Sequence, residues 1–346
     1  MSILAKLKDP IRRHFEAKYA RHYGWNLDSM REYDFASSRW DPYTVDGPLQ
    51  RLRDARRPVD RIQVIPFGRF GNHVIQLKHA LYTASSLSAR SVVIERPEDL
   101  FTLQPGDALV VDERPNPHTP HEETVLRGHF YYERTVRFPL TPSDHARLST
   151  QHIRPLLKPS LLEPDPRVGA EDMVMHFRAG DIMVSGGVNP DYGQPPVSYY
   201  LKAATLSGAK RVWLVYEDMS NPAVCAVQDR LEAAGFEVLL QSGRLEEDAR
   251  LILSARKFAA ATGTFGYALA ELSQNLNQLF SFYEFKTYPL SVFAGRHFDV
   301  VCIEDGNGAY KSAVLNGNWE MSPVQVDLML NYPSEHLSIR PVPAIP

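Results

Sequence analysis

The chain has 346 residues, of which 44% are hydrophobic, and its formal net charge is −3. This length can bury a sizeable core and form two domains of ordinary size. The lack of a basic excess argues against a nucleic-acid-binding protein, so no nucleic-acid partner is expected.

Cysteine content and hydropathy bear on the compartment. The two cysteines, Cys225 and Cys302, are too few for a disulfide framework and fit a reducing compartment, although a single bridge stays open. No apolar run approaches the roughly 18 residues of a membrane-spanning helix. The first ten residues lack the long apolar centre of a signal peptide. We therefore expect a cytoplasmic protein.

Residues 1–58 are expected to form an N-terminal helical extension and a linker. Ile3, Leu7 and Ile11 recur at helical spacing among a surplus of basic residues. One interpretation is an interfacial helix that contacts the inner face of an acidic membrane. The other is an amphipathic helix packed on the body of the protein, and Pro10 favours it because proline interrupts the helical pattern.

The rest of the chain alternates between strand-like and helix-like runs. In the first half we expect strands at 61–65, 91–95 and 108–111 and helices at 72–87 and 143–157. In the second half we expect strands at 173–177, 211–216, 237–240 and 257–262 and helices at 198–206, 222–234, 246–255 and 267–276. Such alternation predicts an α/β fold whose parallel sheet carries helices on both faces.

Two local signals mark boundaries. Thr141 stands where an N-cap is expected for the helix at 143–157. Three prolines within residues 159–166 indicate a domain boundary. The predicted domains are therefore 59–160 and 161–346, after the extension at 1–58.

The first candidate motif is Gly-Arg-Phe-Gly-Asn-His at 68–73, directly after an expected strand. It lacks the third glycine of a dinucleotide fingerprint and the Gly-Lys-Ser/Thr of a P-loop. Two such glycines often only permit a tight turn. A helix that begins near Asn72 would nevertheless present free N–H groups, and Arg69 and Asn72 could reach a substrate there.

The second motif is His-Phe-Arg at 176–178. Alternation in a strand places His176 and Arg178 on one side. An arginine can grip two phosphate oxygens and keeps its charge. A structural hydrogen-bonding pair is the alternative. Gly180, Asp181 and the polar loop at 185–193 follow, and they are typical of a mobile or acceptor-binding element.

The third segment is Thr-Gly-Thr-Phe-Gly at 262–266, between an expected strand and helix. Its hydroxyl and N–H groups could receive part of a diphosphate, or Thr264 could simply cap the helix. Asp248 lies on the preceding helix, where a first-turn acid is favoured by the helix dipole alone. Because open α/β sheets bind ligands at the carboxyl ends of strands, the first two segments together predict a cleft for a small anionic group, and a nucleotide diphosphate is the natural candidate.

In order and spacing, these segments resemble the motifs of the fucosyltransferase superfamily, which includes bacterial α-1,2-fucosyltransferases, α-1,6-fucosyltransferases and protein O-fucosyltransferases. The resemblance covers residues 62–276. It implies a GT-B-like fold of two Rossmann-like domains that face each other across a cleft, with GDP-fucose held mainly by the C-terminal one. It also implies an inverting transfer without a metal ion and without a cofactor beyond the donor substrate.

The same resemblance implies roles for individual residues. Arg178 would neutralise the departing diphosphate, and His176 would line the nucleotide pocket. Asp248 would accept hydrogen bonds from guanine. Thr264 and Phe265 would bind the β-phosphate. Asn72, with Arg69 or Gly71, would reach toward the sugar from the N-terminal domain; the expected catalytic set is Arg178, Asn72 and Asp181.

The expected function is transfer of fucose from GDP-fucose to a glycan or lipid-linked oligosaccharide in the synthesis of a cell-surface polysaccharide. Two alternatives stay open. The first is the same fold with another nucleotide-sugar donor. The second is a non-catalytic protein that binds nucleotides or glycans, and the presence of Arg178 argues against it.

Overall fold

The computed structural model describes residues 33–34, 59–111, 125–131, 140–183, 193–282, 288–315 and 318–340. The expected N-terminal helix and most of the polar loop at 185–193 lie outside these residues. The chain divides into two compact units. The first comprises Met1–Gly68, Asn72–Glu98 and Leu103–Leu140, and the second comprises Arg69–Gly71, Asp99–Thr102 and Thr141–Pro346.

The first unit contains a five-stranded sheet in the order β1-β5-β2-β3-β4. All neighbouring strands are parallel except β3 and β4, which are antiparallel. Helix α3 joins β2 to β3. The elements of this unit are β1 (Tyr33–Asp34), β2 (Arg61–Val64), α3 (Phe70–Leu87), β3 (Ser91–Ile94), β4 (Ala108–Val110) and β5 (Val125–Gly128).

The second unit contains a seven-stranded sheet in the order β12-β11-β10-β9-β6-β7-β8. Only β12 runs antiparallel to its neighbour. The strands are β6 (Asp172–Phe177), β7 (Arg211–Tyr216), β8 (Glu237–Gln241), β9 (Lys257–Ala260), β10 (Gln278–Phe282), β11 (Asp299–Asp305) and β12 (Leu337–Arg340). Two largely parallel sheets with connecting helices confirm the expected α/β fold class.

Local signals account for several helix ends in this unit. Thr141 caps α4 through a reciprocal capping box with Asp144, as expected. Gly208 ends α6 in the left-handed conformation, at φ 63°. The helices are α4 (Pro142–Arg147), α5 (Pro159–Leu162), α6 (Val197–Ser207), α7 (Ala223–Ala233), α8 (Leu245–Ser254), α9 (Thr264–Leu272), α10 (Ala309–Val314) and α11 (Pro323–Asn331).

Short helical turns complete the unit. The helix expected at 143–157 is continuous in extent but changes its hydrogen bonding after α4. It passes through a π-helical segment and a 3-10 turn. The short turns are η4 (Leu148–Ile153), η5 (Arg154–Leu156), η6 (Gly180–Ile182), η7 (Leu290–Phe293) and η8 (Ser334–His336).

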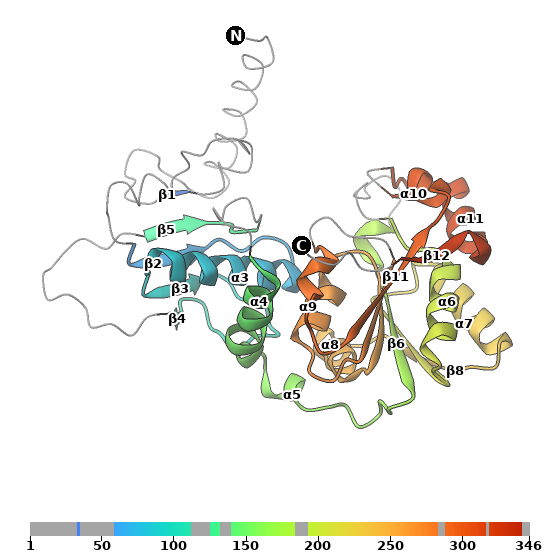
Figure 1. Cartoon of the computed structure of the whole chain (residues 1–346), viewed down its shortest axis with the longest axis horizontal. Helices are drawn as coiled ribbons and strands as arrows, with labels where there is room; N and C mark the ends of the chain where they lie inside the picture. The colour runs from blue at the N-terminus through green and yellow to red at the C-terminus, as the bar shows by residue number, and fades with distance from the viewer. Residues whose placement is uncertain are drawn as a thin grey trace, which may run out of the picture. The chain divides into compact units, whose positions relative to one another are not determined.

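Helices α6 and α7 cover one face of the seven-stranded sheet, and α8 and α9 cover the other (Figure 1). Alternate side chains of β6 point to opposite faces of the sheet. Met173, Met175 and Phe177 lie on the face that α6 and α7 cover, and they belong to the same hydrophobic core. The ring of Phe177 stacks on Tyr200 with centroids 4.3 Å apart. Such a pair adds about 0.5–1.5 kcal/mol to the stabilisation from burial. It anchors the end of β6, from which the second motif projects.

The predicted elements end at residue 276, and the structure completes the sheet beyond it with β10, β11 and β12. Strand β10 is buried along nearly its whole length, so it lacks the alternation by which a half-exposed strand is predicted. Both cysteines, Cys225 and Cys302, are free. None of the helices within the described ranges is long and apolar enough to cross a membrane.

Candidate functional site

The strand order of the seven-stranded sheet reverses direction between β6 and its central strand, β9. From β6 the chain moves outward through β7 to β8, then returns to the other side of β6 at β9 and continues outward through β10 to β11. The connections after β6 and β9 leave the sheet on opposite faces, and open α/β sheets bind ligands outside the carboxyl ends of the strands at such a point. His176 and Arg178 end or follow β6, and Thr264 follows β9. Topology thus brings the second and third motifs to the position where α/β sheets bind ligands.

Arg178 lies against the beginning of α9. Gly263 is the N-cap residue, with φ 108° and ψ 175°, and no side chain caps the helix. A Cβ atom at Gly263 would lie 2.6 Å from Nη1 of Arg178. The first N–H groups of a helix have no partner within it, and they carry the positive end of the helix dipole. A guanidinium beside such a helix start is an arrangement that can bind an anion.

Helix α9 begins three residues before the expected start. This places Thr264 at the first helical position, so the interpretation of Thr264 as the N-cap is wrong. The physical reason is the backbone of Gly263, because its φ and ψ fall in a region that is essentially restricted to glycine. Glycine also removes the side chain that would otherwise occupy the space next to Arg178.

The backbone at the end of β6 is held by buried polar side chains. Nδ2 of Asn221 donates to the carbonyl oxygen of Arg178 at 2.8 Å, and Oδ1 of Asn221 accepts from the N–H of Ala223 at 2.9 Å. The hydroxyl of Tyr200 donates to the carbonyl oxygen of His176 at 3.0 Å. Asn221 was not among the predicted site residues. The dipeptide Asn-Pro directly before a helix was the signal that could have indicated it.

His176 contributes a neutral ring to the site. Burial, and secondly the charge of Arg178, lowers the pKa of His176 to about 3. Its ring lies beside Phe265 with centroids 5.4 Å apart. A Cβ atom at Gly266 would lie 3.5 Å from Nδ1 of His176, in ordinary contact, and 3.1 Å from Cζ of Phe258, so Gly266 packs against both rings. At neutral pH His176 can line a pocket or form neutral hydrogen bonds, but it carries no positive charge for an anion.

Asp248 is buried in the first turn of α8, with 9% of its surface exposed. Its Oδ1 accepts from Nε2 of Gln241 at 3.0 Å. Burial raises the pKa of the Asp248 carboxyl, and hydrogen bonds from Gln241 and from the backbone of Gly243 oppose that rise. Glu247, the preceding residue of the same turn, accepts from the backbone N–H of Arg244 at 3.4 Å and pairs with the Arg244 guanidinium, with Nη2 to Oε1 at 2.8 Å.

The first motif is divided between the two units. Gly68 makes the turn, at φ 73°, and the side chain of Asn72 folds over it: a Cβ atom at Gly68 would lie 1.9 Å from Nδ2 of Asn72. Asn72 belongs to the first unit, whereas Arg69 and Gly71 belong to the second. Gly71 is a helical residue of α3, because that helix begins at Phe70.

Arg69 and Gly71 have specific neighbours within the second unit. A Cβ atom at Gly71 would lie 2.5 Å from the backbone carbonyl of Thr264, so only glycine allows this approach. Nη1 of Arg69 pairs with Oε1 of Glu217 at 3.2 Å, but 73% of the arginine side chain is exposed. An exposed pair of this kind contributes little to stability, so Arg69 can exchange Glu217 for an anionic ligand at small cost.

Asp181 lies in the 3-10 turn η6, and the position of its side chain is outside the described part of the structure. In the described part of the chain, no group of three or more His, Cys, Asp or Glu side chains is placed to hold a metal ion. The structure therefore gathers Arg178, His176, Thr264 and Phe265 at one switch point. Asp248 lies on α8, which covers the same face of that sheet as α9 (Figure 1).

Comparisons with known proteins find matches among solved structures only. No family model matches the chain, and no curated protein matches it in sequence. Solved structures similar to the chain include POFUT1 in complex with GDP, with 12% identity, a TM-score of 0.37, and coverage of 65% of this chain and 98% of that one. POFUT1 in complex with GDP-fucose matches with 12% identity, a TM-score of 0.35, and coverage of 62% and 93%.

These solved structures are of a protein O-fucosyltransferase. At such identities and TM-scores the likeness assigns no role to any residue of this chain. The resemblance to the bacterial α-1,2-fucosyltransferases stays a prediction from sequence.

Proposed function

We propose that this chain is a glycosyltransferase that transfers a sugar from a nucleoside diphosphate sugar. The observation that carries the proposal is the guanidinium of Arg178 beside the uncapped start of α9, at the switch point between β6 and β9. When the bond to the sugar breaks, negative charge develops on the departing diphosphate. A fixed guanidinium and helix N–H groups stabilise that charge without reorganising.

The proposed donor is GDP-fucose. Guanine offers an N1–H and a 2-amino group on one edge, and the carboxylate of Asp248 can accept both. His176 would line the pocket for the nucleotide, and Thr264 and Phe265 would bind the β-phosphate. This assignment rests on the order of the sequence motifs and on the buried, hydrogen-bonded position of Asp248.

The finer parts of the proposal follow from the sequence resemblance. Transfer is inverting and independent of metal, and the acceptor is a glycan or lipid-linked oligosaccharide in cell-surface polysaccharide synthesis. Asn72, Arg69 and Gly71 serve the sugar and acceptor side, and Asp181 completes the catalytic set. The protein works in the cytoplasm, and the basic N-terminal segment, for which we expect a helix, contacts the inner face of the membrane.

A thermal-shift panel of GDP, ADP, UDP, CMP and their sugar conjugates tests the proposal. A ligand at a hundred times its dissociation constant stabilises the fold by about 2.7 kcal/mol, which is a readily measured shift. We expect the largest shift with GDP and GDP-fucose. Asp248→Ala should flatten the difference between GDP and ADP, whereas Asp229→Ala, at an exposed position on α7, should leave it unchanged.

Two outcomes would redirect the proposal. A larger shift with UDP or a CMP-sugar than with GDP would replace the donor and leave the anion site intact. Binding of nucleotide sugars without any hydrolysis or transfer would instead indicate a non-catalytic binding protein. No shift with any nucleotide would reject the site.

A further inference from the structure

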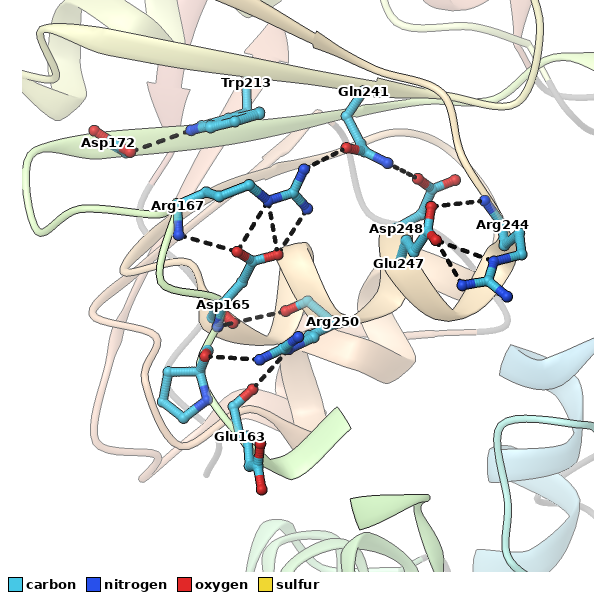
Figure 2. Close-up of polar contacts among 12 residues, drawn as sticks. Glu163, Asp165, Arg167, Asp172, Trp213, Gln241, Arg244, Glu247, Asp248 and Arg250 are labelled. Atoms are coloured by element: carbon cyan, nitrogen blue, oxygen red, sulfur yellow. Dashed lines mark hydrogen bonds and ion pairs between the residues drawn. The ribbon is translucent and has the colours of Figure 1, made fainter. Parts of the chain in front are cut away.

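A chain of hydrogen bonds connects Asp248 to an ion pair some eighty residues earlier in the sequence (Figure 2). Nε2 of Gln241 donates to Oδ1 of Asp248 at 3.0 Å. Oε1 of Gln241 accepts from Nη1 of Arg167 at 3.2 Å. Arg167 in turn grips Asp165, with Nη2 to Oδ2 at 2.7 Å and Nε to Oδ1 at 3.0 Å. Four side chains from three segments of the chain thus form one network.

The charge on Arg167 fixes which way the amide of Gln241 faces. A guanidinium only donates hydrogen bonds and does not lose its proton. The oxygen of Gln241 must therefore face Arg167, and the NH₂ group must face Asp248. The arrangement leaves Asp248 as an acceptor in this contact, a role suited to the ionised carboxylate.

Arg167 is itself held from several sides. Asp165 has only 4% of its side chain exposed, and its backbone N–H donates to Oγ of Ser254 at 2.7 Å. The guanidinium carbon lies 5.5 Å from the ring centroid of Trp213, a favourable cation–π position. The hydrogen bond from Arg167 lowers the pKa of the Asp165 carboxyl, so this pair stays charged at neutral pH. The network presents a fixed amide to Asp248 rather than a mobile one.

We infer, on the basis of the proposed nucleotide site, that Gln241 is a positioning residue for base recognition. The Gln241 amide orients Asp248, and Arg167 sets the direction of that amide. Neither Gln241 nor Arg167 needs to touch the nucleotide. Gln241 occupies the carboxyl end of the edge strand β8, and its partner Asp248 lies in the first turn of the next helix. The short loop between them makes this contact geometrically accessible.

The charges around Asp248 explain why a donor is needed there. Burial and the neighbouring carboxylate of Glu247, which is paired with Arg244, both favour the protonated form of Asp248. The amide of Gln241 and the N–H of Gly243 favour the ionised form. Without the amide, we expect Asp248 to protonate at a higher pH. A protonated carboxyl presents an O–H to the guanine edge, which itself offers donors, so preference for GDP should fall.

The experiment measures dissociation constants of GDP and ADP by calorimetry between pH 5.5 and 8.5. It compares the unaltered protein with Gln241→Leu and Gln241→Glu. The glutamate keeps the shape and the contact with Arg167 but replaces the N–H donor with an oxygen. Gln228→Leu is the matched control, because Gln228 makes the same amide-to-carboxylate bond, to Glu232 at 2.9 Å, on the exposed side of α7.

We expect both Gln241 variants to lose about tenfold to a hundredfold of the GDP-over-ADP preference, because Asp248 loses the donor that orients it. The loss should be larger at the acid end of the pH range and smaller at the alkaline end, because without the amide Asp248 protonates at a higher pH. ADP affinity and the Gln228 control should change little. Recovery of the GDP-over-ADP preference with rising pH distinguishes a positioning role from simple destabilisation of the fold. If Gln241→Leu does not fold, the Gln241→Glu variant provides the test.

Each remaining outcome is decisive. If the unaltered protein prefers GDP and both Gln241 variants keep that preference across the pH range, this inference is wrong and the proposed function stands. A loss that is independent of pH would also reject the inference, since it would indicate a structural role. If the unaltered protein does not prefer GDP, the proposed base recognition fails, and the inference fails with it.

Discussion

Replacing Gly263 with alanine should disable the anion site through the side chain of Arg178. The added Cβ atom would lie 2.6 Å from Nη1 of Arg178. Ordinary contact requires about 3.4 Å, so the guanidinium must retreat by about 0.8 Å. The substitution also forces a residue with a side chain into the backbone conformation at φ 108° and ψ 175°.

The two effects have separable magnitudes. A backbone conformation restricted to glycine costs on the order of 1–3 kcal/mol of folding stability when another residue occupies it. Misplacing a group that binds the reacting charge by about 1 Å can cost about a hundredfold in rate. We therefore expect Gly263→Ala to lower GDP affinity by about tenfold to a hundredfold, with a similar or larger fall in turnover of GDP-fucose.

Gly235→Ala is the matched control. Gly235 also has a positive φ, at 88°, but a Cβ atom there would meet nothing within 4 Å. Both variants should lose stability in urea denaturation, and only Gly263→Ala should lose GDP affinity in calorimetry. If both variants bind GDP as the unaltered protein does, Arg178 does not hold the diphosphate. If both lose affinity equally, the effect is general destabilisation.

Three further predictions concern the same proposal and the stability of the chain. Arg178→Ala should lower turnover of GDP-fucose by about 10²–10³, and Arg178→Lys should not restore it because a point charge lacks the bidentate fork; near-normal turnover in a folded Arg178→Ala protein would remove Arg178 from the site. Transfer should survive EDTA in a direct assay, and activity that EDTA abolishes and manganese restores would reject metal-free chemistry. Burial lowers the pKa of His73 from 6.5 to about 4, so the unfolded chain binds more protons than the folded one between those values. Stability should then fall as pH falls through this window, by at most about 1.4 kcal/mol per pH unit for this group. His73→Gln should flatten that slope in urea denaturation between pH 4.5 and 7.5, and an unchanged slope would contradict the assignment.

Local patterns in the sequence determined most of the secondary structure and the chemistry at the strand ends. The alternation at 173–178 predicted that His176 and Arg178 share a side of the strand. The structure agrees, because Phe177 packs with α6 and α7 while His176 contacts residues at the start of α9. The capping signal at Thr141 was likewise readable, since a cap depends only on residues within one helical turn.

Other features depend on atoms that are distant along the chain. The sheet order places β9 next to β6 rather than next to β8, and this choice creates the switch point at which Arg178 meets α9. The start of α9 at Thr264 depends on the backbone of Gly263, which the propensity of the segment does not predict. The network from Asp165 to Asp248 joins segments separated by more than seventy residues. The sequence therefore determined which residues carry charge and on which side of a strand they project. Only the tertiary structure decided their partners, because strand pairing and side-chain contacts are set by packing across the whole unit.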